Sequence, residues 1–142
     1  MNVIEKLNDF CRNTLIDHLG IEFTETGEGF LRGRMPVDQR TLQPLGILHG
    51  GASLALAETV GSAASYNMVD TNKYTVVGMQ INANHVGTIR EGYVYAQATL
   101  LHKGSKTHVW DVIIHDENQR KISLCRITNM IIEINHQTDV KK

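Results

Sequence analysis

Residues Leu54–Ala64 read Leu-Ala-Leu-Ala-Glu-Thr-Val-Gly-Ser-Ala-Ala, a run of small and apolar residues around one carboxylate. Between Thr41 and Val69, Glu58 is the only residue with a formal charge. Alanine and leucine favour a helix, and we expect one from Gly51 to about Met68. Because no other segment is apolar enough to cover a sheet, this helix is expected to fill the centre of the molecule.

The segments on either side predict one more helix and six strands. Apolar residues at helical spacing indicate an amphipathic helix over Asn2–Leu19, which Gly20 ends. Runs rich in Val, Ile, Thr and Tyr, separated by short polar turns, indicate the strands. They are Ile21–Thr26, Phe30–Val37, Tyr74–Asn84, Gly92–Leu101, His108–His115 and Lys121–Ile134. We therefore predict one α+β domain over residues 1–142, a meandering antiparallel sheet curled around a central helix.

Composition excludes several classes of protein. A formal net charge of −1 argues against a nucleic-acid partner. The segment Ile47–Val69 is not expected to span a membrane, because Glu58 lies in its middle and polar residues dilute it. Met1–Asp9 lacks the pattern of a secretory signal. Cys11 and Cys125 form no Cys-x-x-Cys pair, so we expect free thiols and a cytoplasmic protein.

Glu58 is the first candidate for chemistry. A carboxylate on so apolar a helix is expected to be partly or wholly buried, and burial without a partner is costly. Such a group is typical of a general base or a nucleophile. The structural alternative is a carboxylate paired with a distant arginine or with backbone amides. Ser62, four residues later, shares the helix face of Glu58 and is expected to hold a water beside it.

Gly50-Gly51 opens the same helix without side chains. Free amides at a helix N-terminus carry partial positive charge and suit a developing oxyanion, although close backbone packing explains the two glycines equally well. His49 precedes them, and taken alone it is more typical of a structural histidine than of a catalytic one.

Metal and phosphate motifs are weak. The seven histidines form no His-x-x-x-His pair, so we expect no metal site. Gly104–Thr107 reads Gly-Ser-Lys-Thr but lacks the earlier glycine of a phosphate-binding loop. Lys103 and Lys106 therefore form either a phosphate contact or a solvated turn.

Five runs together form a more specific pattern. They are Leu48–Ser53, Ala57–Ser62, Val77–His85, Arg90–Gly92 and His102–Trp110. In these runs the chain resembles the hotdog-fold acyl-CoA thioesterases, PaaI-like enzymes. The most similar branch holds the 1,4-dihydroxy-2-naphthoyl-CoA hydrolases and the enterobactin-pathway proofreading thioesterase. The resemblance extends from Leu15 to Glu133, and it implies a hotdog fold.

The resemblance also implies roles for the residues at the central helix. Glu58 matches the catalytic carboxylate, which acts as general base or nucleophile. Gly50 matches the residue whose amide polarises the thioester carbonyl. Gln43 and His49 match side chains that orient the acyl group or its carbonyl, and Ser62 matches a hydroxyl that places water or the acyl group.

The resemblance implies that coenzyme A contacts a second set of residues: Arg90, Lys103, Gly104, Ser105 and Lys106. No separate cofactor is expected, because coenzyme A is part of the substrate. The family run Glu-x-Asn-Ala-Asn-His begins with Gln80 here, so a role for an acid at that position does not carry over.

The implied reaction is hydrolysis of an acyl-CoA thioester to a free acid and coenzyme A. An aromatic acyl group such as 1,4-dihydroxy-2-naphthoyl is expected, with benzoyl, phenylacetyl and carrier-protein-bound aryl groups left open. A second hypothesis is a related hotdog hydratase or dehydratase. Those enzymes usually pair a histidine with an acid in a different helix context, and this chain lacks that arrangement. A third hypothesis is a non-catalytic acyl-CoA binding protein. The presence of Glu58 argues against it, because a binding protein has no need for a buried base. The family also implies a homodimer or homotetramer, in which sheets join edge to edge and Gly50 of one subunit meets Glu58 of another.

Overall fold

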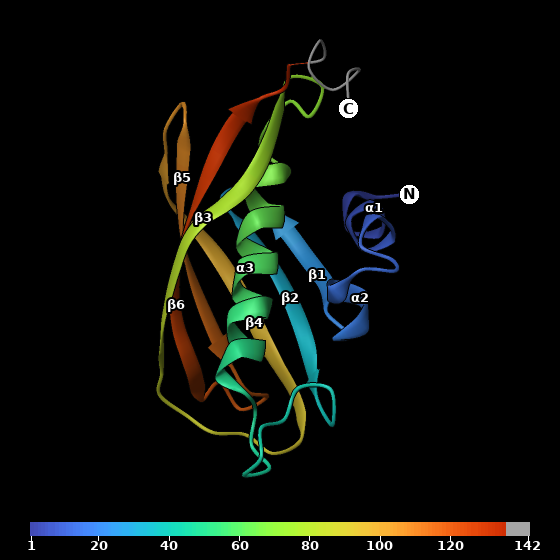
Figure 1. The fold of residues 1–142 in the computed structure, drawn as a ribbon, viewed down its shortest axis with the longest axis vertical. Helices are drawn as coiled ribbons and strands as arrows, with labels where there is room; N and C mark the ends of the chain where they lie inside the picture. Colours follow the sequence, from blue (N-terminus) through green and yellow to red (C-terminus); the bar gives the residue numbers. More distant parts are fainter. Residues whose placement is uncertain (136–142) are drawn as a thin grey trace.

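A six-stranded antiparallel sheet curves around one helix in the computed structural model, which describes residues 1–135 (Figure 1). The strands are β1 (Glu22–Gly27), β2 (Phe30–Val37), β3 (Tyr74–His85), β4 (Gly92–Lys103), β5 (Thr107–His115) and β6 (Lys121–Glu133). Every pairing between them is antiparallel. The predicted α+β hotdog architecture, a sheet wrapped around a long central helix, is confirmed.

The strand order is β1-β2-β4-β5-β6-β3, so the predicted meander is wrong. The helix α3 (Gly50–Tyr66) lies between β2 and β3 in the chain and crosses the face of the sheet. It carries the chain from β2 to the far edge, where β3 pairs with β6. The place beside β2 is therefore taken by β4.

The helix α3 forms the core because its small residues allow close contact with the sheet. Leu56, Ala57 and Val60 are fully buried against the sheet. A Cβ atom added at Gly61 would lie 2.5 Å from a methyl group of Ile127, so only glycine fits there. In residues 1–135, no helix is long and apolar enough to cross a bilayer.

The N-terminal helix is interrupted, so the single helix predicted over Asn2–Leu19 is wrong. The structure has α1 (Val3–Phe10) and α2 (Leu15–His18). Between them Asn13 has a left-handed backbone conformation, with φ 61°, and its backbone N–H donates to the Asp17 carboxylate. Thr14 donates its hydroxyl to the Cys11 carbonyl. These side chains offer the backbone an alternative to helical hydrogen bonds, and helical spacing alone does not reveal it.

The two edges of the sheet differ. The edge strand β1 is short and carries Glu22 and Glu25. The edge strand β3 is 12 residues long and contains no formal charge and no proline. Val77 is 43% exposed and Met79 is 53% exposed on it. A long uncharged edge is a template for pairing with another strand.

Candidate active site

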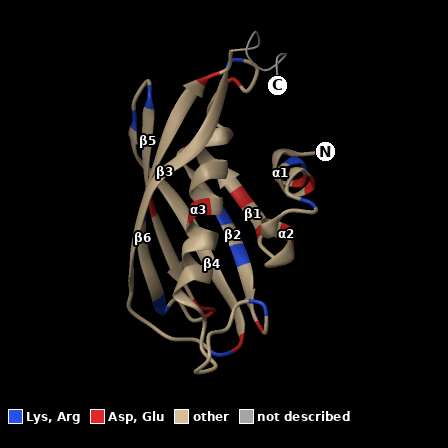
Figure 2. Cartoon of the chain, in the orientation of Figure 1, with Lys and Arg blue, Asp and Glu red and all other residues tan. Residues whose placement is uncertain are grey.

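The structure divides the ten predicted site residues into three groups along the molecule. Near the start of α3 lie Gln43, His49, Gly50 and Arg90; in the middle of α3 lie Glu58 and Ser62; the β4–β5 turn holds Lys103, Gly104, Ser105 and Lys106. In Figure 2, α3 is a helix without charge apart from one acidic position, and basic residues mark the tip of the β4–β5 hairpin.

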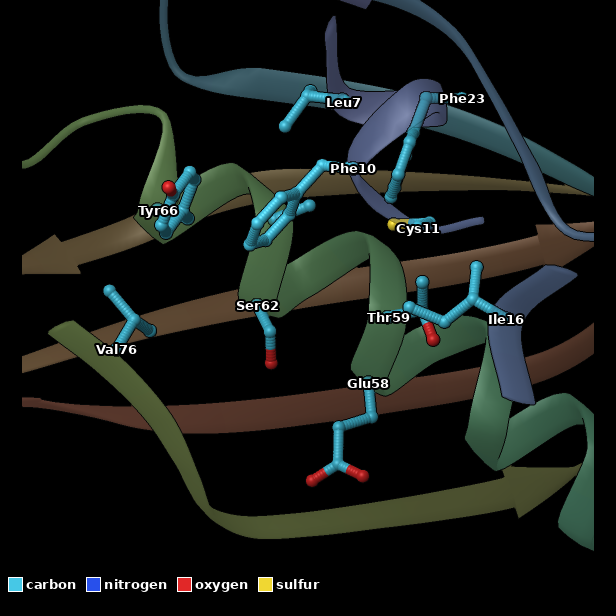
Figure 3. A pocket seen from close by; sticks show the side chains of 11 residues that line it. Leu7, Phe10, Cys11, Ile16, Phe23, Glu58, Thr59, Ser62, Tyr66 and Val76 are labelled. Atoms are coloured by element: carbon cyan, nitrogen blue, oxygen red, sulfur yellow. The ribbon is translucent and has the colours of Figure 1, made fainter. Parts of the chain in front are cut away.

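Glu58 lies in the middle of α3 and points toward β3 (Figure 3). The expected burial is wrong for a single chain, because this carboxylate is exposed. It faces Gly78 so closely that a Cβ atom there would lie 2.5 Å from the Glu58 Oε1 atom. In residues 1–135 it forms no salt bridge, so the structural alternative, an ion-paired carboxylate, is not what the fold provides.

Ser62 projects from α3 in the same direction as Glu58 (Figure 3), as the spacing of four residues predicts. It is half-buried, and its Oγ donates a long hydrogen bond of 3.4 Å to Oδ1 of Asn129 on β6. Asn129 is not among the predicted site residues, since no motif in β6 distinguishes it.

A pocket of about 300 Å³ adjoins Glu58. Its walls are mostly apolar and come from the N-terminal helical region, α3 and the edge strands β1 and β3: Leu7, Phe10, Cys11, Ile16, Phe23, Thr59, Ser62, Ala63, Tyr66 and Val76. At one end Phe10 stacks on Tyr66, with ring centroids 5.7 Å apart. Burial, and secondarily Asp17, raises the pKa of the Cys11 thiol, so this wall residue is neutral. An apolar pocket beside one carboxylate suits an apolar or aromatic ligand.

The amide of Gly50 is the available donor at the start of α3. His49 is the N-cap, and its Nδ1 accepts a hydrogen bond from the Gly51 N–H at 2.7 Å. The Gly51 amide is therefore occupied, whereas within residues 1–135 the Gly50 N–H has no acceptor. A free amide at a helix N-terminus suits an oxyanion. His49 has a structural role here, and its contact with substrate stays a prediction.

His85 is a neighbour of this amide that sequence reasoning does not select. Its Nε2 would lie 2.7 Å from a Cβ atom at Gly50, and its Nδ1 is 2.9 Å from the Ser123 hydroxyl. The only signal for it in the sequence is its place at the end of the Val77–His85 run.

Gln43 and Arg90 hold the turn that precedes α3. The Gln43 Oε1 accepts from the Leu45 N–H, and Arg90 donates to the carbonyls of Leu45 at 3.1 Å and Gly46 at 3.5 Å. Arg90 precedes β4 while Lys103 ends it, so the length of the strand, ~36 Å, lies between the two cations. A single chain therefore does not bring Arg90 together with the lysines.

The β4–β5 turn presents its cations to solvent. The Gly104 N–H donates to the Thr107 carbonyl at 2.8 Å and closes the turn. Lys103, Ser105 and Lys106 are exposed, and neither lysine forms a salt bridge with another described residue. Two unneutralised lysines in one turn are suited to a phosphate. In the same described range, no three His, Cys, Asp or Glu side chains cluster in a way that would hold a metal.

A sheet wrapped around a central helix, with a carboxylate in the helix and a free amide at its start, defines a hotdog-fold thioester hydrolase. Residues 45–123 match the family model described as the thioesterase superfamily. The chain belongs to the thioesterase superfamily.

Sequence and structural relatives are similar to this chain along almost its whole length. The proofreading thioesterase EntH of Cronobacter turicensis is 42% identical over 129 residues, which cover 91% of this chain and 93% of that protein. The structure of a thioesterase variant from Pseudomonas aeruginosa has a TM-score of 0.92 at 42% identity and covers 94% of this chain and 96% of its own. A thioesterase from Haemophilus influenzae gives 0.91 at 42% identity, with coverage of 96% and 95%.

Proposed function

We propose that the protein hydrolyses an acyl-CoA whose acyl group is aromatic, such as 1,4-dihydroxy-2-naphthoyl-CoA. The observation that carries this proposal is the apolar pocket of about 300 Å³ beside the Glu58 carboxylate. Its aromatic end, formed by Phe10 and Tyr66, supports a planar acyl group, since aromatic rings stack favourably.

The working site is proposed to need two copies of the chain. Gly50 and Glu58 are eight residues apart on α3, which separates them by ~12 Å along the helix. One thioester carbonyl does not reach both groups at hydrogen-bonding distance. The uncharged edge of β3 supports a homodimer in which β3 pairs with its copy, and pairing of two dimers would give a homotetramer.

In such a site the thioester oxygen accepts a hydrogen bond from the Gly50 N–H, which stabilises the oxyanion. Glu58 of the other subunit acts in one of two ways. As a base it takes a proton from water, whose oxygen attacks the acyl carbon. As a nucleophile it attacks that carbon itself, and water then hydrolyses the resulting anhydride. Both routes break the C–S bond, and the departing thiolate takes up a proton to give coenzyme A.

The nucleotide of coenzyme A is proposed to contact Lys103, Gly104, Ser105 and Lys106, the exposed turn described above. Arg90 joins the lysines on one nucleotide only if two copies bring opposite ends of β4 together. The free thiols of Cys11 and Cys125 support a reducing compartment, and we propose the cytoplasm.

The test is thiol release from a panel of acyl-CoAs. The panel contains 1,4-dihydroxy-2-naphthoyl, benzoyl, phenylacetyl and linear acyl-CoAs, together with an aryl carrier-protein thioester. We expect the highest kcat/KM for an aromatic member. Tight binding without thiol release would instead identify an acyl-CoA binding protein, and hydration of an enoyl-CoA would identify a hydratase.

A further inference from the structure

We propose that Asn129 is a positioning residue for hydrolysis, which orients the Ser62 hydroxyl through a buried hydrogen-bond network. The proposal rests on the proposed function, because it concerns the role of Ser62 beside Glu58. It assigns Ser62 the part of a hydrogen-bond acceptor toward the attacking water or toward a polar group of the acyl moiety.

Asn129 is fully buried on β6 and contacts one face of α3 with both ends of its amide. Its Nδ2 donates to the Gly61 carbonyl at 3.0 Å and to the Ser65 Oγ at 2.8 Å. Its Oδ1 is 3.4 Å from the Ser62 Oγ. On the other side, Asn129 is paired in register with Gly78 of β3, the residue that the Glu58 carboxylate faces. One side chain thus connects α3 to the strands behind the candidate site.

The orientation of the Asn129 amide follows from the Gly61 carbonyl, which can only accept and therefore requires the Nδ2 atom at 3.0 Å, and this orientation determines the hydrogen bonds at Ser65. The buried Ser65 Oγ accepts from the Trp110 indole N–H at 2.7 Å and from the Asn129 Nδ2 at 2.8 Å. A hydroxyl has two lone pairs and one proton, so its proton is left to donate to Nδ1 of His108, 3.0 Å away. This arrangement requires a neutral His108 with its proton on Nε2.

The surroundings of His108 favour that neutral form. His108 is 2% exposed and is paired in register with Lys103 of the adjacent strand β4, where His102 is the preceding residue. On α3 and β6 its neighbours in the network are uncharged, namely Ser65 and Asn129. Burial, and then Lys103 and His102, lowers the pKa of His108.

Because the Asn129 amide nitrogen is committed to Ser65 and Gly61, its oxygen is the atom that faces Ser62. The Ser62 hydroxyl donates its proton to that oxygen, and its lone pairs remain for the site. An acceptor at this place orders a water whose other proton is directed to Glu58, which is the arrangement that general-base attack requires.

A double-mutant cycle tests this role on the best acyl-CoA of the panel. Asn129→Ala and Ser62→Ala should each lower kcat roughly tenfold, the scale of one lost neutral hydrogen bond, with little change in KM. The double variant should be no slower than Ser62→Ala, because Asn129 acts through Ser62. As a matched control, Asn8→Ala removes an asparagine that pairs with the Phe23 backbone, and its effect should multiply with that of Ser62→Ala. Multiplying losses for Asn129 and Ser62 would overturn the proposal.

A second readout does not depend on turnover. Trp110 is the only tryptophan of the chain and donates to Ser65, so its fluorescence reports on the network. Ser65→Ala and Asn129→Ala should each shift the Trp110 emission of the folded protein, and Asn8→Ala should not. Unchanged emission in both network variants would refute the hydrogen-bond assignment. If the emission shifts as expected but the protein hydrolyses no thioester, the hydrogen-bond network is supported and the proposed function is overturned instead.

Discussion

Glu58 is surrounded by residues that leave its carboxylate free. It is exposed on α3, has no ion-pair partner in residues 1–135, and lies against Gly78. Glu58→Gln keeps the size of the side chain and removes its basicity. We expect kcat to fall by about 10²–10⁴-fold while the melting temperature changes little. Glu28→Gln, in the exposed β1–β2 turn, is the control. A Glu58→Gln enzyme with most of its kcat would refute the catalytic role.

Gly78 controls where that carboxylate lies. An added Cβ atom would be 2.5 Å from the Glu58 Oε1 atom, and the end of a flexible exposed side chain moves more easily than a strand. Gly78→Ala is therefore expected to displace the carboxylate without unfolding the protein. Steady-state kinetics should show a lower kcat, and thermal denaturation should show a nearly unchanged melting temperature. If kcat stayed at the wild-type value, the close approach of Glu58 to Gly78 would not matter for turnover.

His108 makes stability depend on pH. Burial lowers its pKa in the folded state below the ordinary value of about 6.5, so the unfolded chain binds more protons at mildly acidic pH. The stabilisation is complete above that ordinary value and is lost as the pH falls through the lowered folded value. We expect the melting temperature to fall on acidification from neutral pH. His108→Asn keeps an acceptor for Ser65 without titrating, and a pH dependence as steep as in the wild type would contradict the assignment.

Among the elements, the β4–β5 turn is expected to affect binding rather than chemistry. Lys103→Ala and Lys106→Ala should raise KM for acyl-CoA and leave kcat almost unchanged, because a phosphate contact is shared by ground state and transition state. Added salt should weaken the wild-type interaction, since both lysines are exposed. An acyl N-acetylcysteamine thioester, which has no phosphate, is the control substrate. Equal losses on both substrates would assign the lysines to another role.

Arg90 is distinguished from the lysines by the same pair of substrates. Its guanidinium braces the turn at Leu45 and Gly46. A loss confined to acyl-CoA would place Arg90 at a phosphate, whereas a loss on both substrates would assign it to the Gln43 turn.

The elements that sequence predicts well are those whose own residues determine them. The helix α3 and all six strands agree with their predicted ranges within a few residues, because their composition and periodicity are strong. The break between α1 and α2 escapes prediction because it depends on hydrogen bonds that the Thr14 and Asp17 side chains form with the backbone. The exposure of Glu58 escapes prediction because it depends on which element covers α3, and that is decided by strand order.

At the scale of the whole molecule, the separation of Gly50 from Glu58 predicts complementation between subunits. Gly50 is the first residue of α3, a position where proline is tolerated. A proline there removes the N–H, and its ring would displace the exposed His85 side chain. Gly50→Pro and Glu58→Gln should each be inactive. When the two variants are mixed in equal amounts and their subunits reassociate at random, half of the dimers contain one subunit of each variant. Each of these mixed dimers has one intact site. We therefore expect about a quarter of wild-type activity.

The control for this experiment is the double variant carrying both substitutions, mixed with itself, which should stay inactive. Light scattering should show at least a dimer at micromolar concentration. A monomer, or mixtures without recovered activity, would show that one chain completes its own site.

The wall of the pocket that α1 and α2 provide lies outside the part of the chain that matches the family model, residues 45–123. The carboxylate and the amide lie inside it. Part of the wall of the proposed acyl pocket is thus encoded apart from the two groups proposed for bond cleavage, whereas Thr59, Ser62 and Tyr66 of the same wall lie within residues 45–123. Exchanging the first twenty or so residues with those of a relative is therefore expected to change the acyl preference and to retain the reaction.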